Sequence, residues 1–448
     1  MQPTLQRQRG AVAIMVAVCL VLVLAMAGLV MDGGLAYLVK ARLNAAVDAA
    51  AVAGARAVTT GNTEAQQRAS AQQAAAEFFA ANIPSSYMLS KPKLLGTTVS
   101  FNGGMVTVDV KAEAPMPVSL MQVMGATSMT PVASAQTIRQ DLDMAFVIDT
   151  SASLSTAFPA VKTAAKSFLE KFNMAQDRVS LIHFSYGAVI DKAIRPVDRG
   201  FDRPAMINTI TNYSYGGGTA SVEGMWQARQ QLNSILDVNK STLRVIVFFS
   251  DGEPTSFGSF LTLAPPNAGA CKDRAGTIDL DGRGMYKLNA QSELITGCNF
   301  NGGGYGYVKQ LPEWYNAHET SATGTDNQEF RIKATSPRPV SLNVGDTVAW
   351  RTNVDRAARN LVEAVAAKAQ DEGIFVFTLG LGANLKVPKG IDNEIGENVL
   401  KCMANVADGP ARCHNPNKPV GMYCHAATQA DLTPCFSRLA SAILRISK

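Results

Sequence analysis

Two apolar runs in the second part of the chain each lead into an aspartate. Residues 144–148 (MAFVI) precede Asp149 in the sequence DTSAS, and residues 245–249 (VIVFF) precede Ser250 and Asp251 in SDGEP. Short uninterrupted runs rich in Val, Ile and Phe are typical of strands that are buried on both faces of a parallel sheet. The sequence therefore predicts that both carboxylates follow the ends of buried parallel strands.

Strand-like and helix-like stretches alternate around these runs. This alternation predicts an α/β fold, with a doubly wound, mainly parallel sheet that helices cover on both faces. Ligands of such sheets bind outside the carboxyl ends of the strands. The predicted strands are residues 144–149, 178–184, 188–194, 243–249 and 374–379, and the predicted helices are residues 156–172, 220–236, 354–371 and 431–446.

Oxygen-bearing side chains gather at the predicted strand ends. Thr219, in the sequence YGGGTAS before a predicted helix, can reach the same edge of the sheet as the two aspartates. Carboxylates and hydroxyls are the hard ligands that Mg²⁺ prefers, and Ca²⁺ and Mn²⁺ are the alternatives. Two carboxylates do not complete the coordination of such an ion, so positions stay open for water or for an incoming carboxylate. We predict one divalent cation at Asp149, Ser151, Ser153, Thr219 and Asp251.

The order of these residues is D-x-S-x-S, then a distant Thr, then a distant Asp before Gly. This pattern resembles the metal-ion-dependent adhesion site (MIDAS) of von Willebrand factor type A domains, and the resemblance covers about residues 141–448. It implies that Ser151, Ser153 and Thr219 contact the metal, whereas Asp149 and Asp251 often act through water. The alternative is a degenerate domain that keeps the fold without the metal, but no ligand position is lost here.

The N-terminal part carries an uncharged segment, residues 11–31, which follows Arg7 and Arg9. At about 1.5 Å per residue, a helix of this length spans about 31 Å, which matches the hydrocarbon core of a bilayer. Basic residues before the span keep the short N-terminus in the cytoplasm, so the rest of the chain is exported. A cleaved secretory signal is the alternative. Because the apolar part of such a signal is usually about 7–15 residues long, we expect a retained helix.

A second resemblance lies in the same region. The R-x-x-G-x-x-A-I-M motif at residues 7–15, Asp32 near the end of the apolar span, and the small-residue run 44–55 are similar to TadG-like proteins of the tight-adherence (Flp) pilus system. In that family this segment often precedes a von Willebrand A domain, as it does here. Prepilin processing sites commonly carry Glu at the fifth position after the glycine, whereas Met15 stands there after Gly10.

The pilus resemblance implies a location and partners. It places the protein in the inner membrane with a periplasmic C-terminal domain, or incorporated into an extracellular pilus, at its tip. The implied partners are pilus subunits or assembly proteins. We therefore expect residues 1–140 to form a TadG-like, pilin-like α+β region, with a long helix at 11–58, a second helix at 65–81 and a β-hairpin at 97–110.

The predicted von Willebrand A-like domain, residues 141–448, contains an insertion at about residues 254–353. The insertion is too long for a simple loop. Residues 340–344 and 347–351 within it are strand-like. Because the insertion begins directly after Asp251, we expect it to emerge beside the metal site as a recognition subdomain or lid. The alternative is a solvated decoration without contact to a ligand.

Cysteines support export. Cys19 lies in the apolar segment, where we expect an unpaired, inert thiol. An even number of cysteines in an exported region predicts disulfides, and we favour a bridge within the insertion and pairing of the last four among themselves. Zinc is the alternative, because His414 and His425 each follow a cysteine, although structural zinc sites usually have C-x₂₋₄-C spacing. The disulfide candidates are Cys271, Cys298, Cys402, Cys413, Cys424 and Cys435.

Charge and motifs exclude other functions. The formal net charge is +5 with scattered Lys and Arg, which gives no basic patch for nucleic acid. We find no phosphate-binding loop and no G-x-S-x-G nucleophile motif, so we do not expect an enzyme. The predicted function is a pilus-associated protein whose metal-dependent adhesion site binds a carboxylate-bearing partner or surface ligand. The alternative is a periplasmic structural or assembly subunit with no direct adhesive role.

Overall fold

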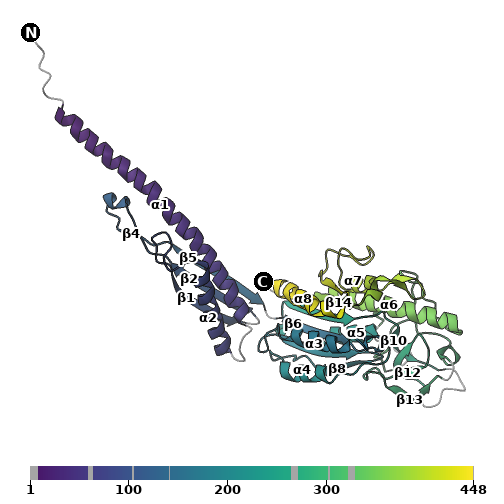
Figure 1. Cartoon of the computed structure of the whole chain (residues 1–448). Helices are drawn as coiled ribbons and strands as arrows, with labels where there is room; N and C mark the ends of the chain where they lie inside the picture. The colour runs from purple at the N-terminus through teal and green to yellow at the C-terminus, as the bar shows by residue number, and fades with distance from the viewer. Residues whose placement is uncertain are drawn as a thin grey trace, which may run out of the picture. The chain divides into compact units, whose positions relative to one another are not determined.

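The computed structural model describes residues 9–58, 64–102, 105–140, 142–263, 271–300, 303–320 and 328–446. The chain divides into two compact units, Met1–Arg139 and Gln140–Ser447 (Figure 1). Arg7 and the start of the predicted motif at 7–15 lie outside the described residues. The same holds for three parts of the predicted insertion, residues 264–270, 301–302 and 321–327.

The first unit is built on a long helix, α1 (Arg9–Ala57), and a second helix, α2 (Glu64–Asn82). Both are rich in Ala, which has the highest helix propensity and lets helices approach closely. A Cβ added at Gly54 would lie 3.2 Å from the carbonyl oxygen of Ala71, so α1 and α2 nearly touch there. By length and composition, one helix among the described residues, Val12–Ala57, is able to cross a membrane. The helices predicted at 11–58 and 65–81 are present.

A three-stranded sheet completes the first unit, with the order β1-β2-β5. β1 (Lys93–Asn102) and β2 (Met105–Glu113) form the predicted antiparallel hairpin, extended beyond residues 97–110 at both ends. Val106, Val108 and Val110 alternate along β2 and are fully buried in one core with residues of α1 and α2. The sequence analysis did not predict β5 (Val132–Gln140), the short hairpin β3 (Met116–Pro117) with β4 (Ser128–Met129), or the 3₁₀ turn η1 (Met121–Met124) between them.

The second unit contains a six-stranded sheet with the order β17-β14-β9-β6-β7-β8. All neighbours are parallel except β8, which runs antiparallel to β7. Every residue of β6 is buried, as its apolar sequence predicts. The strands are β6 (Leu142–Asp149), β7 (Arg178–Phe184), β8 (Ala188–Lys192), β9 (Leu243–Ser250), β14 (Ile374–Leu381) and β17 (Met422–Ala426).

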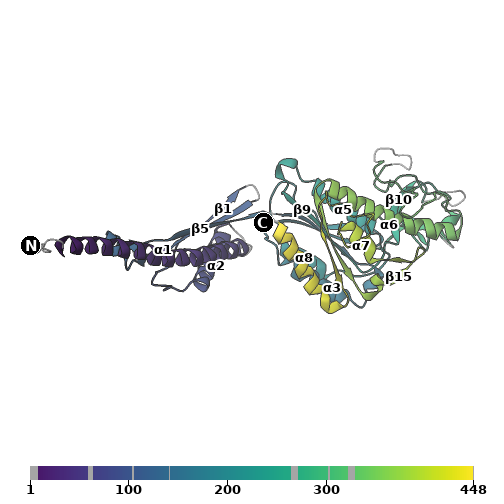
Figure 2. The ribbon, with the colours of Figure 1, turned by 90° about the horizontal axis from the view of Figure 1, so that it is seen from above.

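Helices cover both faces of this sheet (Figure 2). Alternate residues of β6 point to opposite faces, so Phe146 belongs to one core cluster and Val147 to the other. The first face is covered by α3 (Phe158–Leu169), α4 (Arg203–Thr211) and α8 (Leu432–Ile446), and the second by α5 (Ser221–Asn233), α6 (Thr347–Asp371) and α7 (Glu397–Met403). The predicted fold class, a doubly wound and mainly parallel α/β sheet, is confirmed.

The insertion folds against the second face of the sheet. Its four antiparallel strands share a continuous core with α5 and α6, to which Phe257, Ile278 and Trp350 contribute. Trp350 Nε1 also donates a hydrogen bond to the carbonyl oxygen of Asp279 (2.9 Å). The insertion is therefore part of the domain rather than a separate body. Its strands are β10 (Ser256–Leu261), β11 (Arg274–Asp279), β12 (Gly284–Tyr286) and β13 (Leu294–Asn299).

Two strand predictions near the end of the insertion are wrong. Residues 347–351 form the first turns of α6, because the Asp346 side chain caps the helix and accepts a hydrogen bond from the amide of Ala349 (2.8 Å). Residues 340–344 make only isolated bridges, at Val340 and Asn343. α6 thus begins at Thr347, earlier than the start at residue 354 that the sequence predicted for this helix.

Three disulfides lie in the second unit: Cys271–Cys298, Cys402–Cys413 and Cys424–Cys435. The bridge that we favoured within the insertion is present, and the last four cysteines pair with one another. Cys19 is unpaired and exposed on α1. The disulfide prediction is confirmed, and in this oxidised form the last four cysteines offer no thiolates for the zinc alternative.

Candidate metal-ion site

The carboxyl ends of two neighbouring strands bring the aspartates together. β6 and β9 are parallel and in register up to Ile148 and Phe249, so Asp149 and Ser250 leave the sheet at the same edge. Asp149 is fully buried, and both of its carboxylate oxygens accept hydrogen bonds. Ser151 N donates to Oδ1 (2.7 Å), and Ser250 Oγ donates to Oδ2 (2.6 Å). The strand ends thus fix the orientation of this carboxylate.

Hydroxyls link Asp149 to the second carboxylate. Ser151 Oγ lies 3.1 Å from Ser153 Oγ, and Ser153 Oγ donates to Asp251 Oδ1 (2.8 Å). Asp149 and Ser151 are buried, Asp251 is half-buried and Ser153 is exposed. Four of the five predicted ligands therefore form one connected cluster that runs from the interior to the surface.

Thr219 follows a glycine run and lies beside the turn after Asp251. Its amide donates to Thr255 Oγ1 (3.2 Å), and its carbonyl accepts from the amide of Thr255 (3.0 Å). A Cβ added at Gly252 would lie 3.8 Å from Thr219 Oγ1, so this hydroxyl borders the turn that follows Asp251. Gly217 has a φ of +80°, and a Cβ there would lie 2.2 Å from Ser185 Oγ. Glycine is therefore required for the loop to deliver Thr219.

The electrostatics of the two carboxylates fit a bound cation. Burial, together with the charge of Asp251, raises the pKa of Asp149 from its usual 3.8 to about 7. Burial also raises the pKa of Asp251, to about 6. Within the described part of the chain, neither carboxylate forms an ion pair with Lys, Arg or His. A buried and a half-buried carboxylate without a counter-charge, set among hydroxyls, form a donor set that suits a hard divalent ion.

The insertion contacts the loop that carries the predicted ligands. Gln291 Nε2 donates to the carbonyl oxygens of Ser214 (2.7 Å) and Thr150 (3.4 Å). The carbonyl of Gln291 in turn accepts from the amide of Tyr186 (2.9 Å). Thr150 stands between two predicted ligands, so this part of the insertion borders the site. No motif marks Gln291, and the sequence analysis did not single it out.

A buried arginine holds the loop after Asp251. Arg359 is almost fully buried in α6, and it donates to Glu253 Oε2 (2.5 Å) and to Glu394 Oε2 (3.1 Å). Glu253 follows Asp251 by two residues, so the ion pair restrains the Asp251 turn from the side of α6. No local sequence pattern indicates this contact, because Arg359 and Glu253 lie more than a hundred residues apart.

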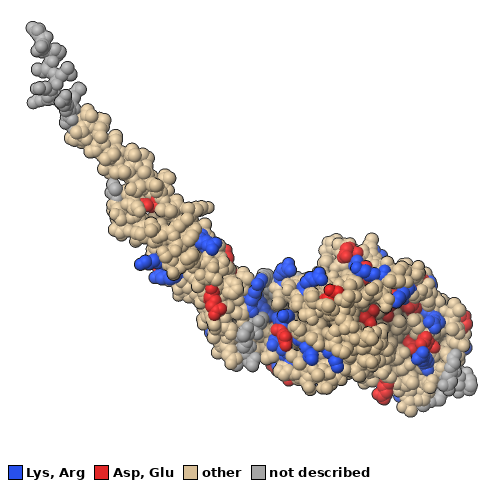
Figure 3. All heavy atoms as spheres, viewed as in Figure 1, with Lys and Arg blue, Asp and Glu red and all other residues tan. Residues whose placement is uncertain are grey.

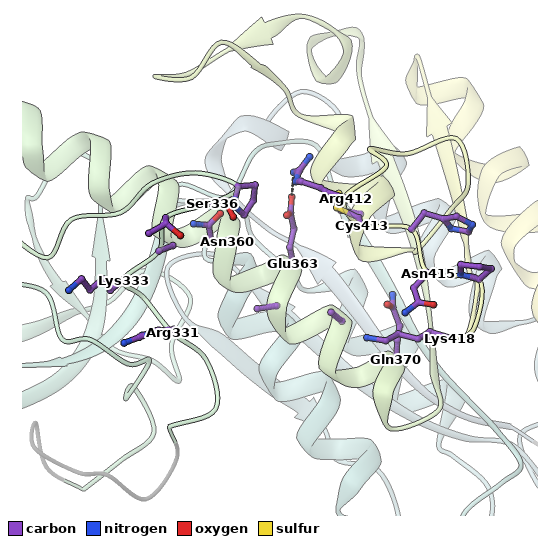
Figure 4. Close-up of a pocket in the computed structure, with 18 residues that line it drawn as sticks. Arg331, Lys333, Ser336, Asn360, Glu363, Gln370, Arg412, Cys413, Asn415 and Lys418 are labelled. Atoms are coloured by element: carbon purple, nitrogen blue, oxygen red, sulfur yellow. Dashed lines mark hydrogen bonds and ion pairs between the residues drawn. A yellow bond between two sulfur atoms is a disulfide. The ribbon is translucent and has the colours of Figure 1, made fainter.

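A large pocket lies away from these ligands. Figure 4 shows it on α6, between residues 331–337 of the insertion and the loop 412–418, with a volume of about 1120 Å³. Arg412 donates to Glu363 within it (2.9 Å). Glu363 lies close to the sulfurs of Cys402 and Cys413, but their disulfide removes both thiolates as metal ligands. The pocket thus provides no second candidate metal site.

Sequence comparison agrees with both resemblances. Residues 143–277 match the family model of the von Willebrand factor type A domain, so the fold of the second unit belongs to this class of domain. Residues 10–57 match the model described as putative Flp pilus-assembly TadE/G-like. The chain therefore carries a TadE/G-like N-terminal segment and a von Willebrand factor type A domain, as the two resemblances indicated.

No curated protein matches the chain. Solved structures that resemble it include the PilB minor pilin from Streptococcus sanguinis, with 13% identity over 80% of this chain and 79% of that one and a TM-score of 0.39. The vWF domain of the type V pili tip protein Mfa5 from Porphyromonas gingivalis is 15% identical over 69% and 97%, with a TM-score of 0.40. The pilus adhesin SpaC from Lactobacillus rhamnosus GG is 13% identical over 81% and 35%, with a TM-score of 0.38.

Proposed function

We propose that this protein is an exported, pilus-associated protein that binds a partner through a divalent cation. The cation, Mg²⁺ in preference to Ca²⁺ or Mn²⁺, is held by the five predicted ligands. The observation that carries this proposal is the buried, uncompensated carboxylate of Asp149, linked through Ser151 and Ser153 to Asp251. The TadE/G-like segment and the von Willebrand A domain support the association with a pilus.

The geometry of the cluster suits capture of an anionic group. When bound, the ion supplies the positive charge that keeps both carboxylates ionised and attracts a carboxylate of the partner. Ser250 Oγ and the Ser151 amide hold Asp149 in one orientation, so little rearrangement is needed at binding. Ser153 is exposed, which leaves the outer side of the cluster accessible to a Glu or Asp side chain. The protein acts here by binding, without a chemical reaction.

The remaining features suit an exported protein. In our proposal, α1 anchors the chain in the inner membrane through residues 11–31, and the second unit lies in the periplasm or on the pilus, at its tip. Three disulfides match an oxidising compartment. Its partners are pilus subunits, assembly proteins or a surface ligand.

The test combines metal binding with attachment. We expect Ser151→Ala and Thr219→Ala to abolish Mg²⁺ binding in titration calorimetry and to impair attachment and partner capture by intact cells, as chelation does. Thr156→Ala is the matched control, because Thr156 is an exposed hydroxyl residue just beyond the cluster. Normal attachment and an unchanged partner set in both metal-site variants would refute the adhesive role and favour the structural subunit.

The insertion can be tested separately. Gln291 borders the ligand loop without belonging to the ligand set, so Gln291→Ala should change partner capture while Mg²⁺ binding persists. Gln310→Ala, at an exposed position elsewhere in the insertion, is the control that should leave both unchanged. Loss of Mg²⁺ binding in Gln291→Ala alone would assign this residue to the support of the metal loop instead.

A further inference from the structure

A loop of the first unit packs against the end of the apolar helix segment. A Cβ added at Gly28 of α1 would lie 2.9 Å from the carbonyl carbon of Leu120 and 3.0 Å from the amide of Met121. Gly28 falls within the predicted membrane span, residues 11–31. At about 1.5 Å per residue, it lies about 4–5 Å inside the end of that span. The loop of residues 119–125 therefore reaches the level at which the helix enters the apolar layer.

A buried carboxylate fixes this loop to α1. Asp32 is almost fully buried, and its Oδ2 accepts hydrogen bonds from the amides of Ser119 (3.1 Å), Leu120 (2.9 Å) and Met121 (2.8 Å). Three amide donors satisfy the charge of a group that would otherwise be costly beside a bilayer. The loop amides are satisfied at the same time, so the loop can lie at the membrane boundary without exposing these polar backbone groups.

Large side chains are exposed on the loop and on the part of α1 that follows Asp32. Met124, at the end of η1, has 62% of its surface exposed, and Tyr37, five residues beyond Asp32 on α1, has 73% exposed. Figure 3 shows the adjoining N-terminal half of α1 as an uncharged surface. Exposed apolar side chains are costly in water, and Tyr is enriched where membrane proteins meet the lipid headgroups. These side chains match a lipid boundary.

A second exposed turn with apolar side chains is hydrogen-bonded to the segment that precedes this loop. Met88 and Leu89 form a two-residue turn with φ values of 49° and 64°, which apolar residues seldom adopt. Both side chains are exposed. The amide of Lys91, just after this turn, donates to the carbonyl of Pro115 (2.9 Å), on the strand segment that leads into the loop. Strained backbone that displays apolar groups is a feature of binding surfaces rather than of packing.

We propose that the loop of residues 119–125 inserts into the headgroup–acyl boundary of the bilayer and gives the first unit a second membrane contact beside α1. This inference rests on the proposed function, in which α1 spans the membrane. Two contacts restrict tilt and rotation of the first unit about the helix axis, as interfacial anchors do for other membrane helices. The loop thereby sets the orientation of the first unit at the membrane.

The test measures lipid contact at single labelled cysteines in the full chain. Purified protein in phosphatidylcholine vesicles carries a polarity-sensitive thiol dye at Cys19, or, in a Cys19→Ser background, at Met124→Cys or Ser100→Cys. Ser100 is exposed near the far end of β1 and serves as the aqueous control. Phosphatidylcholine brominated on its acyl chains then quenches dyes that touch lipid. We expect strong quenching at position 19, quenching at position 124 at least about twofold above that at position 100, and a blue-shifted emission at 124.

Matched glycine variants link the result to the loop. Gly28→Leu should displace the loop and reduce quenching at position 124 to the level at position 100. Gly33→Leu should not, because an added Cβ there meets nothing within 4 Å. Quenching at position 19 without quenching at position 124 would overturn this inference. The loop would then contact a protein partner rather than lipid. No quenching at position 19 would instead refute the membrane anchor itself.

Discussion

The buried carboxylate of Asp149 makes the metal-free protein sensitive to pH in a defined direction. Its pKa is raised from 3.8 to about 7 by burial and by the charge of Asp251. Between these values the folded state holds a proton that the unfolded state has lost. Stability of the metal-free domain therefore falls as pH rises from about 4 to about 7. Asp251, whose pKa is also raised, contributes in the same direction.

Asp149→Asn removes the cost of ionisation while keeping the shape of the side chain. At about 1.4 kcal/mol per pH unit, the rise in the pKa of Asp149 sets an upper limit of about 4 kcal/mol. The amide loses one of the two acceptor contacts with Ser151 N and Ser250 Oγ, which costs about 1–2 kcal/mol. In chelator at pH 8, we therefore expect the variant to be more stable than wild type by about 2–3 kcal/mol. At pH 5, where Asp149 is protonated, the advantage should vanish.

Urea unfolding of the full chain, followed by tryptophan fluorescence, measures this difference. Trp226, Trp314 and Trp350 all lie in the second unit, so the signal reports that unit alone. Mg²⁺ should stabilise the wild type by mass action and leave Asp149→Asn unchanged. Asp198→Asn, an exposed position, is the control. Equal destabilisation of Asp149→Asn at both pH values, or an equal response to Mg²⁺, would refute the reasoning.

Further substitutions test residues that hold the ligand loop or stabilise the fold of the second unit. Gly217→Ala forces a side chain into the positive-φ position of the ligand loop; we expect a loss of about 1–3 kcal/mol in urea unfolding and weaker Mg²⁺ binding by calorimetry. Arg178→Met removes the closest charged partner of the buried Asp143 carboxylate and leaves it the longer contact with Arg199; we expect a cost of about 3 kcal/mol, partly recovered by adding Asp143→Leu. Replacing the Cys271–Cys298 bridge by alanines should cost about 3–4 kcal/mol, measured in the same way.

Elements with a strong local signal could be predicted from the sequence. β6, β7 and β9 agree with their predicted bounds to within two residues, because buried parallel strands are short apolar runs. The clustering of Asp149 with Asp251 could be foreseen for a related reason: parallel strands end at one edge of the sheet. Metal binding at this cluster remains a prediction.

Local sequence propensity gives the wrong prediction where helix capping or strand pairing decides the structure. Thr347 and Val348 favour strands, yet Asp346 starts a helix there by capping its first turn. β17 (Met422–Ala426) was missed because its mixed polar sequence forms a strand only through pairing with β14. The contacts of Gln291 with Thr150 depend on the three-dimensional path of the insertion, which no local pattern encodes.

The position of Asp149 at the end of β6 gives this strand a mechanical role. β5 ends at Gln140 and β6 begins at Leu142, and Asp149 closes the same strand. If a partner is held at Asp149 as proposed, a pull on it would travel along β6 toward the start of this strand at Leu142. Because β7 and β9 flank β6 in parallel register, their hydrogen bonds would share this load and be sheared together rather than opened one by one. The parallel pairing of β6 with β7 and β9 would therefore resist a pulling force applied at Asp149.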